Sequence, residues 1–269
     1  MQIGGGFSSS LLSSLLQQTN NQLNQVITQL ASGKSINSAS DNAAGLSLVN
    51  DLQSSVNSLN TANQGINLAQ GALNTASGAL QSQTDQLQQL KDLAVQSANG
   101  TLNPNDRAAL QQQFDQVVQS IDSISKNTSF NGVNLLDGSF NQSIQTGAAA
   151  GQSLNVAIGS TSANSLGINS IGISDQTSAS NALSVIDSAI QKVDSTQSSI
   201  GASQNTLNFS SQNNQSTVEN LSQAQSQAGD ANLAETVSKF NQLQIQQQAQ
   251  IDAEQALLKT QGNLTKLFG

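Results

Sequence analysis

Residues 52–94, LQSSVNSLNTANQGINLAQGALNTASGALQSQTDQLQQLKDLA, have an apolar residue at every seventh position. The members of this row are Leu52, Leu59, Ile66, Leu73, Leu80, Leu87 and Ala94. A sustained seven-residue apolar repeat is typical of long helices that pack side by side as a coiled coil. It predicts one helix over about residues 43–99, with small flanking residues that let a partner helix approach closely.

A second apolar repeat lies later in the chain and predicts the partner helix. Its members are Ile186, Val193, Ile200 and Leu207, within a helix expected at about residues 180–225. Two heptad segments in one chain are expected to pack against each other. A shorter helix is predicted at 104–127, because Asn103 can cap it and Pro104 suits the first helical position. The predicted fold class is therefore mainly α, built from long coiled-coil helices.

The pattern changes after residue 128, where short strands are expected in place of helices. Asn131-Gly132 and Asp137-Gly138 are turn dipeptides, and a Gly/Ala-rich loop separates two short alternating stretches. These features predict a β-hairpin region over about residues 128–175. Residues 159–180, which overlap the end of this region, are rich in Ser, Gly and Asn, so we expect loop or weak strand there.

Both ends of the chain are predicted to be helical, with weaker apolar stripes. The predicted packing residues are Leu12, Leu16, Leu23 and Leu30 near the start, and Val237, Phe240, Ile251 and Leu258 near the end. Gln fills many intervening positions, so each terminal helix is expected to be completed by partners. The chain should then divide into an inner, discontinuous coiled-coil domain of residues 1–42 with 228–269 and an outer rod of residues 43–227.

A connector between these two domains is predicted where the helical pattern breaks. Its residues are Gly33, Asn37, Asp41 and Gly45. Gly33 should end the first helix, and the Ser/Asn run after it favours turns over helix interior. Asp41 is the predicted N-cap of the long helix that follows. A matching connector is expected on the returning part of the chain, near Gly229 and Asp230.

The composition argues against several classes of function. The chain has no His and no Cys, 9% charged residues and a net charge of −8. Nucleic-acid binding and thiol chemistry are therefore not expected, and the scattered Asp residues lack metal-ligand spacing. Asp252 with Glu254 fits a solvated helix edge better than an acid–base pair. We expect no catalytic residue, no cofactor and no metal.

The sequence also bears on membranes and export. No stretch approaches the 18 apolar residues that a membrane-spanning helix needs, so no membrane insertion is expected. The start of the chain lacks the features of a cleaved signal, because its first positive charge is Lys34 and serines divide its apolar pairs. If this protein leaves the cell, we expect it to do so by a route that reads its unprocessed end.

Five stretches of the chain carry a resemblance to a known family. In order they are LASGKSINSASDNAAGL at 30–46, LKDLAVQSANGTLNPNDRAALQQQF at 90–114, SFNGVNLLDGS at 129–139, AIQKVDSTQSSIGASQNTLNFS at 189–210 and QALLKTQGNLTKLFG at 255–269. They resemble bacterial flagellin in the same order and at similar spacing. The resemblance implies the short form of that family, without variable outer domains inserted in the middle.

The resemblance implies a structural subunit that is exported through the flagellar type III apparatus and self-assembles into a hollow helical filament for swimming. The implied partners are many copies of the same chain, the flagellar cap, the hook-filament junction proteins, an export chaperone and the export apparatus. The implied location is the extracellular filament. An alternative is the hook-filament junction protein itself. A lipid-surface binder would need a basic polar face and large apolar anchors, which are missing, and an enzyme is the least favoured class.

One departure from the family concerns charge. Ser35, Ser40 and Asn42 stand where many flagellins have charged side chains. Charged contacts between subunits should then be few, and filament stability is expected to depend only weakly on salt.

A second departure concerns recognition by the host. Flagellins that the vertebrate Toll-like receptor for flagellin recognises have an Arg, a Leu and a Glu on the outer rod. The matching positions here are Gln89, Leu93 and Gln113. The resemblance therefore implies weakened receptor signalling.

Overall fold

The computed structural model describes residues 3–268, with side chains described for residues 9–260, 262 and 263. Its elements are α1 (Ile3–Ser32), α2 (Ala39–Ser97), α3 (Pro104–Asn127), β1 (Ser129–Phe130), β2 (Val133–Asn134), β3 (Asn141–Gln145), β4 (Ser153–Ala157), α4 (Ala163–Leu166), α5 (Gln176–Gly229) and α6 (Leu233–Phe268). The mainly helical fold class predicted from the sequence is confirmed. The chain forms two compact units. The rod unit is Val56–Val218, and the terminal unit consists of the chain up to Ser55 and from Glu219 onward.

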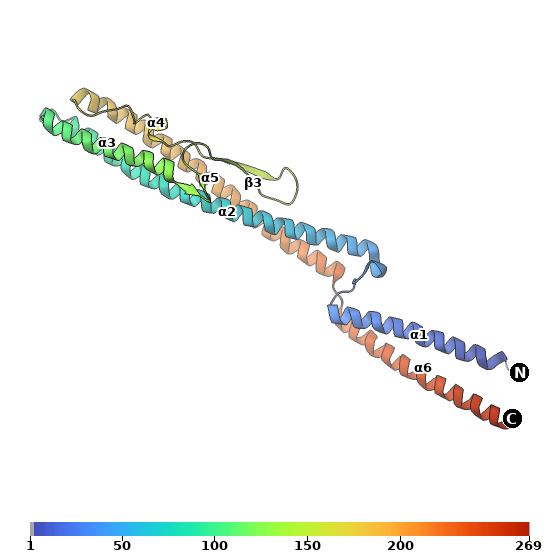
Figure 1. The fold of residues 1–269 in the computed structure, drawn as a ribbon. Coiled ribbons are helices and arrows are strands. Elements are labelled where there is room, and N and C mark those ends of the chain that lie inside the picture. Colours follow the sequence, from blue (N-terminus) through green and yellow to red (C-terminus); the bar gives the residue numbers. More distant parts are fainter. Residues whose placement is uncertain (1–2, 269) are drawn as a thin grey trace. The chain divides into compact units, whose positions relative to one another are not determined.

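The rod unit is built on α2 and α5, which lie side by side in Figure 1. The buried heptad residues are Leu59, Ile66, Leu73, Leu80 and Leu87 of α2 and Ile186, Val193, Ile200 and Leu207 of α5. Amide pairs border this seam: Gln70 Nε2 donates to Asn208 Oδ1 over 2.6 Å, and Gln204 Nε2 donates to Asn74 Oδ1 over 2.8 Å. Gln70 pairs with Asn208, and Asn74, further along α2, pairs with Gln204, which comes earlier on α5. The two helices are therefore antiparallel.

A third helix, α3, covers this pair and starts with a double cap. Asp106 N–H donates to Asn103 Oδ1 over 3.0 Å, and Asn103 N–H donates to Asp106 Oδ2 over 3.4 Å. Pro104 occupies the start of the helix, where its missing N–H leaves no bond unmade. Phe114 and Ile121 of α3 are fully buried, so the helix adds its apolar face to the core of the rod.

Two short strand pairs follow α3. The turn between β1 and β2 is Asn131-Gly132, whose φ angles of 50° and 77° are the left-handed values of a type I′ turn. β3 then pairs antiparallel with β4, from Asn141 opposite Ala157 to Gln145 opposite Ser153. The hairpin is joined to α5, because Asn214 Nδ2 donates to the carbonyl of Thr146 over 2.9 Å.

Side chains of the helices hold the irregular backbone of this region. The hydroxyl of Ser125 on α3 donates to the carbonyl of Leu136 over 2.8 Å, and the hydroxyl of Ser97 on α2 donates to that of Ile173 over 2.5 Å. All four residues are buried. A buried carbonyl without a partner is costly, so these hydroxyls allow loop backbone to lie against the helices.

The expectation of loop over residues 159–180 is confirmed for most of the stretch up to Asp175 and is wrong for two helical segments. Ala163–Leu166 form the helical turn α4, which Ser162 caps and Gly167 ends with φ +80°. α5 begins at Gln176, earlier than predicted, because Asp175 accepts hydrogen bonds from the N–H groups of Thr177 and Ser178 over 3.0 and 2.9 Å. The hydrogen bond from the Ser178 hydroxyl, followed by those from the N–H groups of Ser178 and Thr177, lowers the pKa of Asp175. Ser and Asp served here as helix caps rather than as loop residues.

Candidate assembly site: the terminal helix pair and its connectors

The terminal unit contains the helices α1 and α6, which lie side by side in Figure 1. α1 has no charged residue from Ile3 to Ser32. Its buried side chains are Thr19 and Val26, each 2% exposed, and those of α6 are Thr236 and Leu243. The predicted packing residues of α1, which are Leu12, Leu16, Leu23 and Leu30, are half-buried.

Two of the four residues predicted to pack on α6 lie outside its contact with α1 in the single chain. Val237 and Leu258, predicted to pack, are 42% and 56% exposed. Phe240 and Ile251 are half-buried. Besides these two, the seam contains the buried Thr236 and Leu243 and the half-buried positions 247, 250, 254 and 257. Val237 and Leu258 each follow a seam position, and one residue turns a helix by about 100°, so their side chains point away from α1.

Polar residues occupy much of the seam between α1 and α6. Gln247 Nε2 donates to Asn20 Oδ1 over 2.6 Å, and the hydroxyl of Thr19 donates to the Leu15 carbonyl over 3.0 Å. Gln250 Oε1 is buried and has no hydrogen-bond partner among the residues whose side chains are described. A seam of this composition buries little apolar area and gains little stability from it.

Apolar side chains of both terminal helices remain exposed. They are Leu11, Leu15 and Ile27 on α1 and Leu233, Val237, Ile245 and Leu258 on α6. Among the described residues of the two helices, Val26 and Leu243 alone are buried apolar side chains. The pair therefore presents more large apolar residues to solvent than it buries.

The first connector begins where α1 ends. Gly33 follows the helix with φ +70°, and its N–H donates to the Gln29 carbonyl over 2.9 Å. A left-handed glycine of this kind closes a helix without steric cost. Gln29 also donates through Nε2 to the Ser35 carbonyl over 3.0 Å, which ties the connector to the last turn of α1.

Asp41 organises the connector but is not the helix cap that the sequence predicted. Its Oδ2 accepts the N–H groups of Asn37 and Ser38 over 3.0 and 2.9 Å, and its Oδ1 accepts Gln25 Nε2 over 2.9 Å. The backbone bond from Asn37, followed by the bonds from Gln25 and Ser38, lowers the pKa of Asp41. Asp41 therefore joins the connector loop to α1 through a carboxylate that is favoured in its charged form.

α2 is interrupted at Asn42, which is the N-cap of the long helix that follows it. Its backbone is extended, with φ −163° and ψ 98°, and its Oδ1 accepts the Gly45 N–H over 2.9 Å. Asn is as good an N-cap residue as Asp, so sequence alone did not decide between the two neighbours. Gly45 leaves room for two side chains: a Cβ there would lie 2.5 Å from Ile36 Cδ1 and 2.8 Å from Asn42 Nδ2, so the ends of both side chains would have to shift.

The returning connector pairs with the first. Ser35 N–H donates to the Gly229 carbonyl over 2.8 Å, and Ala231 N–H donates to the Gly33 carbonyl over 2.9 Å. The hydroxyl of Ser35 also donates to Gly229 over 3.2 Å. These bonds join two segments almost two hundred residues apart in sequence, at the place where α5 ends and α6 is about to begin. The pairing could not be read from either segment alone.

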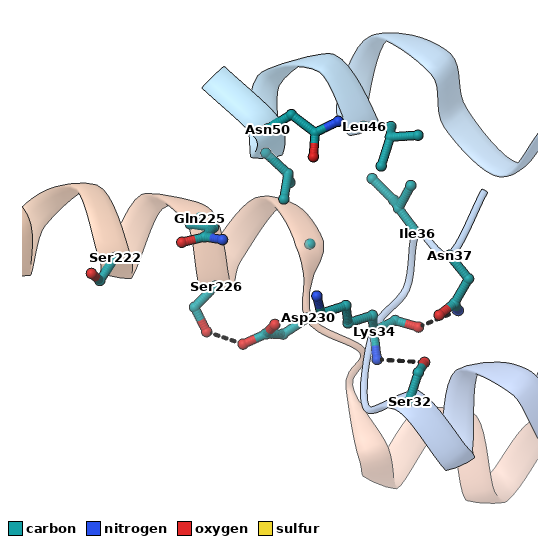
Figure 2. Close-up of a pocket in the computed structure, with 12 residues that line it drawn as sticks. Ser32, Lys34, Ile36, Asn37, Leu46, Asn50, Ser222, Gln225, Ser226 and Asp230 are labelled. Carbon is teal, nitrogen blue, oxygen red and sulfur yellow. Dashed lines mark hydrogen bonds between the residues drawn. The ribbon is translucent and has the colours of Figure 1, made fainter. Parts of the chain in front are cut away.

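A polar pocket of about 650 Å³ lies beside the paired connectors, within the terminal unit. Figure 2 shows Lys34 extending from the connector, with Leu46 and Asn50 on α2 across from it. Ser226 donates to the carboxylate of Asp230 at the same wall. Among the described residues, no cluster of His, Cys, Asp and Glu could hold a metal ion. The residues that line the pocket come from the two connectors and from the adjoining ends of α1, α2 and α5.

The three positions at which the resemblance to flagellins implies receptor recognition lie in the rod unit. Gln89 and Leu93 are on α2, and Gln113 is on α3. Both Gln side chains are exposed, whereas Leu93 is half-buried against the core. The surface is thus accessible, and at these positions it carries no charge.

In the part of the chain that the structure describes, no helix is long and apolar enough to cross a membrane. The architecture is that of a helical subunit with a packed rod and a loosely packed terminal helix pair. Residues 7–141 match the model of the bacterial flagellin N-terminal helical region, and residues 183–268 match that of the C-terminal helical region. The chain belongs to the bacterial flagellin family. It is a structural subunit of the flagellar filament and not an enzyme.

Two curated relatives span nearly the whole chain. Flagellin FlaB1 of Treponema pallidum is 29% identical over 262 residues, which are 91% of this chain and 92% of that protein. The flagellar filament 33 kDa core protein of Treponema phagedenis is 30% identical over 262 residues, with the same shares covered. The crystal structure of Bacillus cereus flagellin is similar with a TM-score of 0.52 and 29% identity, over 56% of this chain and 88% of that one.

Proposed function

We propose that this chain is exported to the cell exterior and polymerises with other copies of itself through the terminal helices, forming a filament that rotates for swimming. In this proposal residues 1–42 with 228–269 are the assembly domain, and residues 43–227 are a rod that folds before assembly. The connector at Gly33, Asn37, Asp41 and Gly45 joins the two. The partners proposed for export and assembly are the export chaperone and apparatus, the hook-filament junction proteins and the cap.

The observation that carries this proposal is the unequal packing of the two units. Leu73, Leu80 and Leu87 in the rod are fully buried, whereas Leu11 and Leu258 on the terminal helices are 63% and 56% exposed. Burying a Leu side chain contributes about 1.5–3 kcal/mol. Copies that cover each other's terminal helices therefore gain stability that a single chain lacks.

The uncharged character of α1 supports the same proposal. A helix of 30 residues without a charged side chain is poorly suited to permanent exposure to water. It is well suited to packing among other helices, where no charge has to be desolvated. The exposed Leu11, Leu15 and Ile27 then have a place in the assembled state rather than in the free chain.

Seeded polymerisation of the purified chain tests the proposal. We expect filaments from the full chain by electron microscopy, and soluble helical monomers from a variant that lacks residues 1–40 and 230–269. Filaments from the truncated variant would contradict the assignment of assembly to the terminal helices. A full chain that folds but never polymerises on seeds would instead favour a junction protein.

We also propose that the rod surface signals weakly through the vertebrate flagellin receptor. Gln89 and Gln113 offer amides where receptor-active flagellins have an Arg and a Glu, and only Leu93 keeps the residue type. Reporter cells should therefore respond less than to a strong agonist flagellin. The double variant Gln89→Arg with Gln113→Glu should raise the response. A response of the unmodified chain equal to that of the agonist would overturn the proposal.

A further inference from the structure

We infer that Asn99 deamidates spontaneously in the folded chain, through a succinimide ring that its side chain forms with the backbone nitrogen of Gly100. The site is the turn between α2 and α3, within the rod unit. The product is Asp or isoaspartate at this position, so the modified chain carries an additional negative charge. This covalent modification needs no enzyme and is independent of the proposed self-assembly.

Asn-Gly dipeptides offer the least steric resistance to this cyclisation. Glycine has no Cβ, so its backbone nitrogen can approach the preceding side chain closely. The chain contains two such dipeptides, Asn99-Gly100 and Asn131-Gly132. Both are exposed to water, which the reaction consumes. The two sites differ in the hydrogen bonds around their reacting atoms.

The side-chain amide of Asn99 is held toward the Gly100 peptide. Thr101 N–H donates to Asn99 Oδ1 over 3.2 Å, and the Thr101 hydroxyl donates to the same atom over 3.0 Å. A bond from the N–H two residues later folds the Asn side chain back over the intervening peptide, as in an Asx turn. Negative charge develops on Oδ1 when Cγ is attacked, so the two Thr101 donors also stabilise the tetrahedral intermediate.

The backbone nitrogen of Gly100 is activated through the carbonyl to which it is conjugated. When its N–H loses a proton, the negative charge is shared by resonance with the carbonyl oxygen of Asn99. Arg107 Nη2 donates to that oxygen over 2.9 Å, and Leu102 N–H donates to it over 3.3 Å. A guanidinium forms a strong, charge-assisted hydrogen bond to an anionic oxygen. Arg107 therefore favours the deprotonated nitrogen, which is the nucleophile.

Arg107 is fixed in this position by a second bond. Its Nε donates to the Ser97 carbonyl at the end of α2 over 3.0 Å. Arg107 takes part in neither of the ion pairs found among the described residues. Its positive charge is therefore not neutralised by a contact and acts on the Asn99 carbonyl.

The second Asn-Gly dipeptide lacks this arrangement. Asn131 is a central residue of a type I′ turn with φ +50°, and the paired strands β1 and β2 hold its backbone. In the part of the chain that the structure describes, nothing donates to its side chain. Asn99 is instead the first residue of its turn, whose dihedral angles the turn type does not prescribe. Ring closure at Asn131 requires the hairpin turn to open, whereas ring closure at Asn99 does not.

The reaction balances with water as the only co-reactant. Water takes the proton of the Gly100 N–H, and the nitrogen forms a bond to Asn99 Cγ. The bond from Cγ to Nδ2 then breaks, and this nitrogen takes up a proton from water and leaves as ammonia. Water opens the ring at the side-chain carbonyl to give Asp, or at the backbone carbonyl to give isoaspartate. Overall, water is consumed and ammonia is released, and nothing is oxidised or reduced.

Mass spectrometry of the full chain tests the inference. The protein is incubated in neutral buffer made with heavy-oxygen water and is then digested with trypsin in ordinary water, so that the label marks residues that reacted during incubation. Asn99 lies in the tryptic peptide 92–107 and Asn131 in the peptide 127–192. We expect Asn99 to react at least about tenfold faster than Asn131 in the folded chain, and at a similar rate in urea. A ratio in the folded chain no higher than that in urea would overturn the inference.

Gly100→Ala is the matched block of the reaction. The φ angle of Gly100 is not positive, and an added Cβ would lie 3.7 Å from Gln176 Nε2, which is an ordinary contact. The fold should therefore be retained, while the methyl group hinders the attack and slows the reaction at Asn99 about tenfold or more. An unchanged rate in this variant would contradict attack by this backbone nitrogen.

Further variants identify the donors, with the rate at Asn131 in the same molecule as the internal reference. Arg107→Gln and Thr101→Val should each slow the reaction at Asn99 about threefold or more, because each removes a donor to an oxygen that becomes negative. Thr101→Ser keeps the hydroxyl and should keep the rate within about twofold. Circular dichroism checks that the variants remain helical. Unchanged rates in both Arg107→Gln and Thr101→Val would show that the dipeptide alone sets the rate, and would overturn the inference.

Discussion

The rod unit and the terminal unit both contain paired antiparallel helices, but the rod buries a full row of apolar residues in its seam, whereas the terminal pair fully buries few of its own. Ile66, Leu73 and Leu80 of the rod are fully buried. In the terminal pair, Thr19 and Thr236 take such positions, and Val237 is exposed. The difference shows that one arrangement of helices can serve two purposes. In the rod it stabilises the single chain, and in the terminal pair it leaves apolar surface for other copies.

The largest change in stability is expected when a fully buried side chain of the rod seam is shortened. Leu80→Ala is expected to lower the free energy of unfolding by about 2–5 kcal/mol, because a fully buried side chain is replaced by a cavity. The matched control is Leu68→Ala on the same helix, where the side chain is 65% exposed and a change within about 0.5 kcal/mol is expected. Chemical denaturation followed by circular dichroism measures both. Similar losses for the two variants would contradict the assigned seam.

A second, smaller effect concerns the connector. Gly45→Ala is expected to destabilise the terminal unit by about 1–3 kcal/mol, because the new Cβ would lie 2.5 Å from Ile36 Cδ1. Gly78→Ala is the control: nothing lies within 4 Å of its Cβ, and it should stabilise α2 by about 0.5–1 kcal/mol. Hydrogen exchange of the connector amides and thermal unfolding report the two changes. A stabilising Gly45→Ala would show that the connector repacks freely.

Acid should loosen the connector before it affects the apolar core of the rod. The pKa of Asp41 is lowered in the folded chain, so its bonds stabilise the fold above the pKa of the unfolded chain and are lost as pH falls through the folded value. Below about pH 4, the amides of Asn37 and Ser38 should therefore lose protection, which is measured as their exchange rate relative to that of the unfolded chain at the same pH. In Asp41→Asn they should exchange fast at neutral pH as well. Protection that stays constant from pH 6 to pH 2 would contradict this role.

The smallest effect is expected from salt. Among the described residues, ion pairs join Lys91 to Asp187 and Lys126 to Asp122, both in the rod. α1 has no charged side chain, so it forms no ion pair with a neighbouring helix that salt could weaken. Raising sodium chloride from about 50 to about 300 mM should change the critical concentration of assembly less than twofold. A steep loss of filaments would show that charged contacts between copies dominate.

Much of the rod could be predicted from local sequence. The heptad row through Leu73 and Leu80 indicated a buried helix, since apolar side chains at that spacing share one face. The cap at Asn103 and the turn at Asn131-Gly132 follow from the conformations that those residues favour. Patterns of this kind depend only on residues that are close in sequence, so they can be recognised without knowledge of the tertiary structure.

The terminal unit could be predicted less well, for a physical reason. The apolar stripe of α6 through Val237 and Leu258 indicated a packed face, and the chain places that face outward. Periodicity shows which residues share a face but not which partner covers it. The same limit applies to Asp41 and Asn42, which are adjacent and equally fit to cap.

By itself, the sequence determined that this protein is mainly helical, that two long heptad helices pair in its rod, and that it has the motifs of a flagellin. These properties depend on spacing and on the local preferences of residues. Only the tertiary structure decided which residues of α6 pack on α1. It also decided that Gln25 of α1 donates a hydrogen bond to Asp41, and that the hydrogen bond from Ser35 to Gly229 joins the two connectors. Such contacts depend on segments far apart in the chain meeting in space, and no local pattern records where they meet.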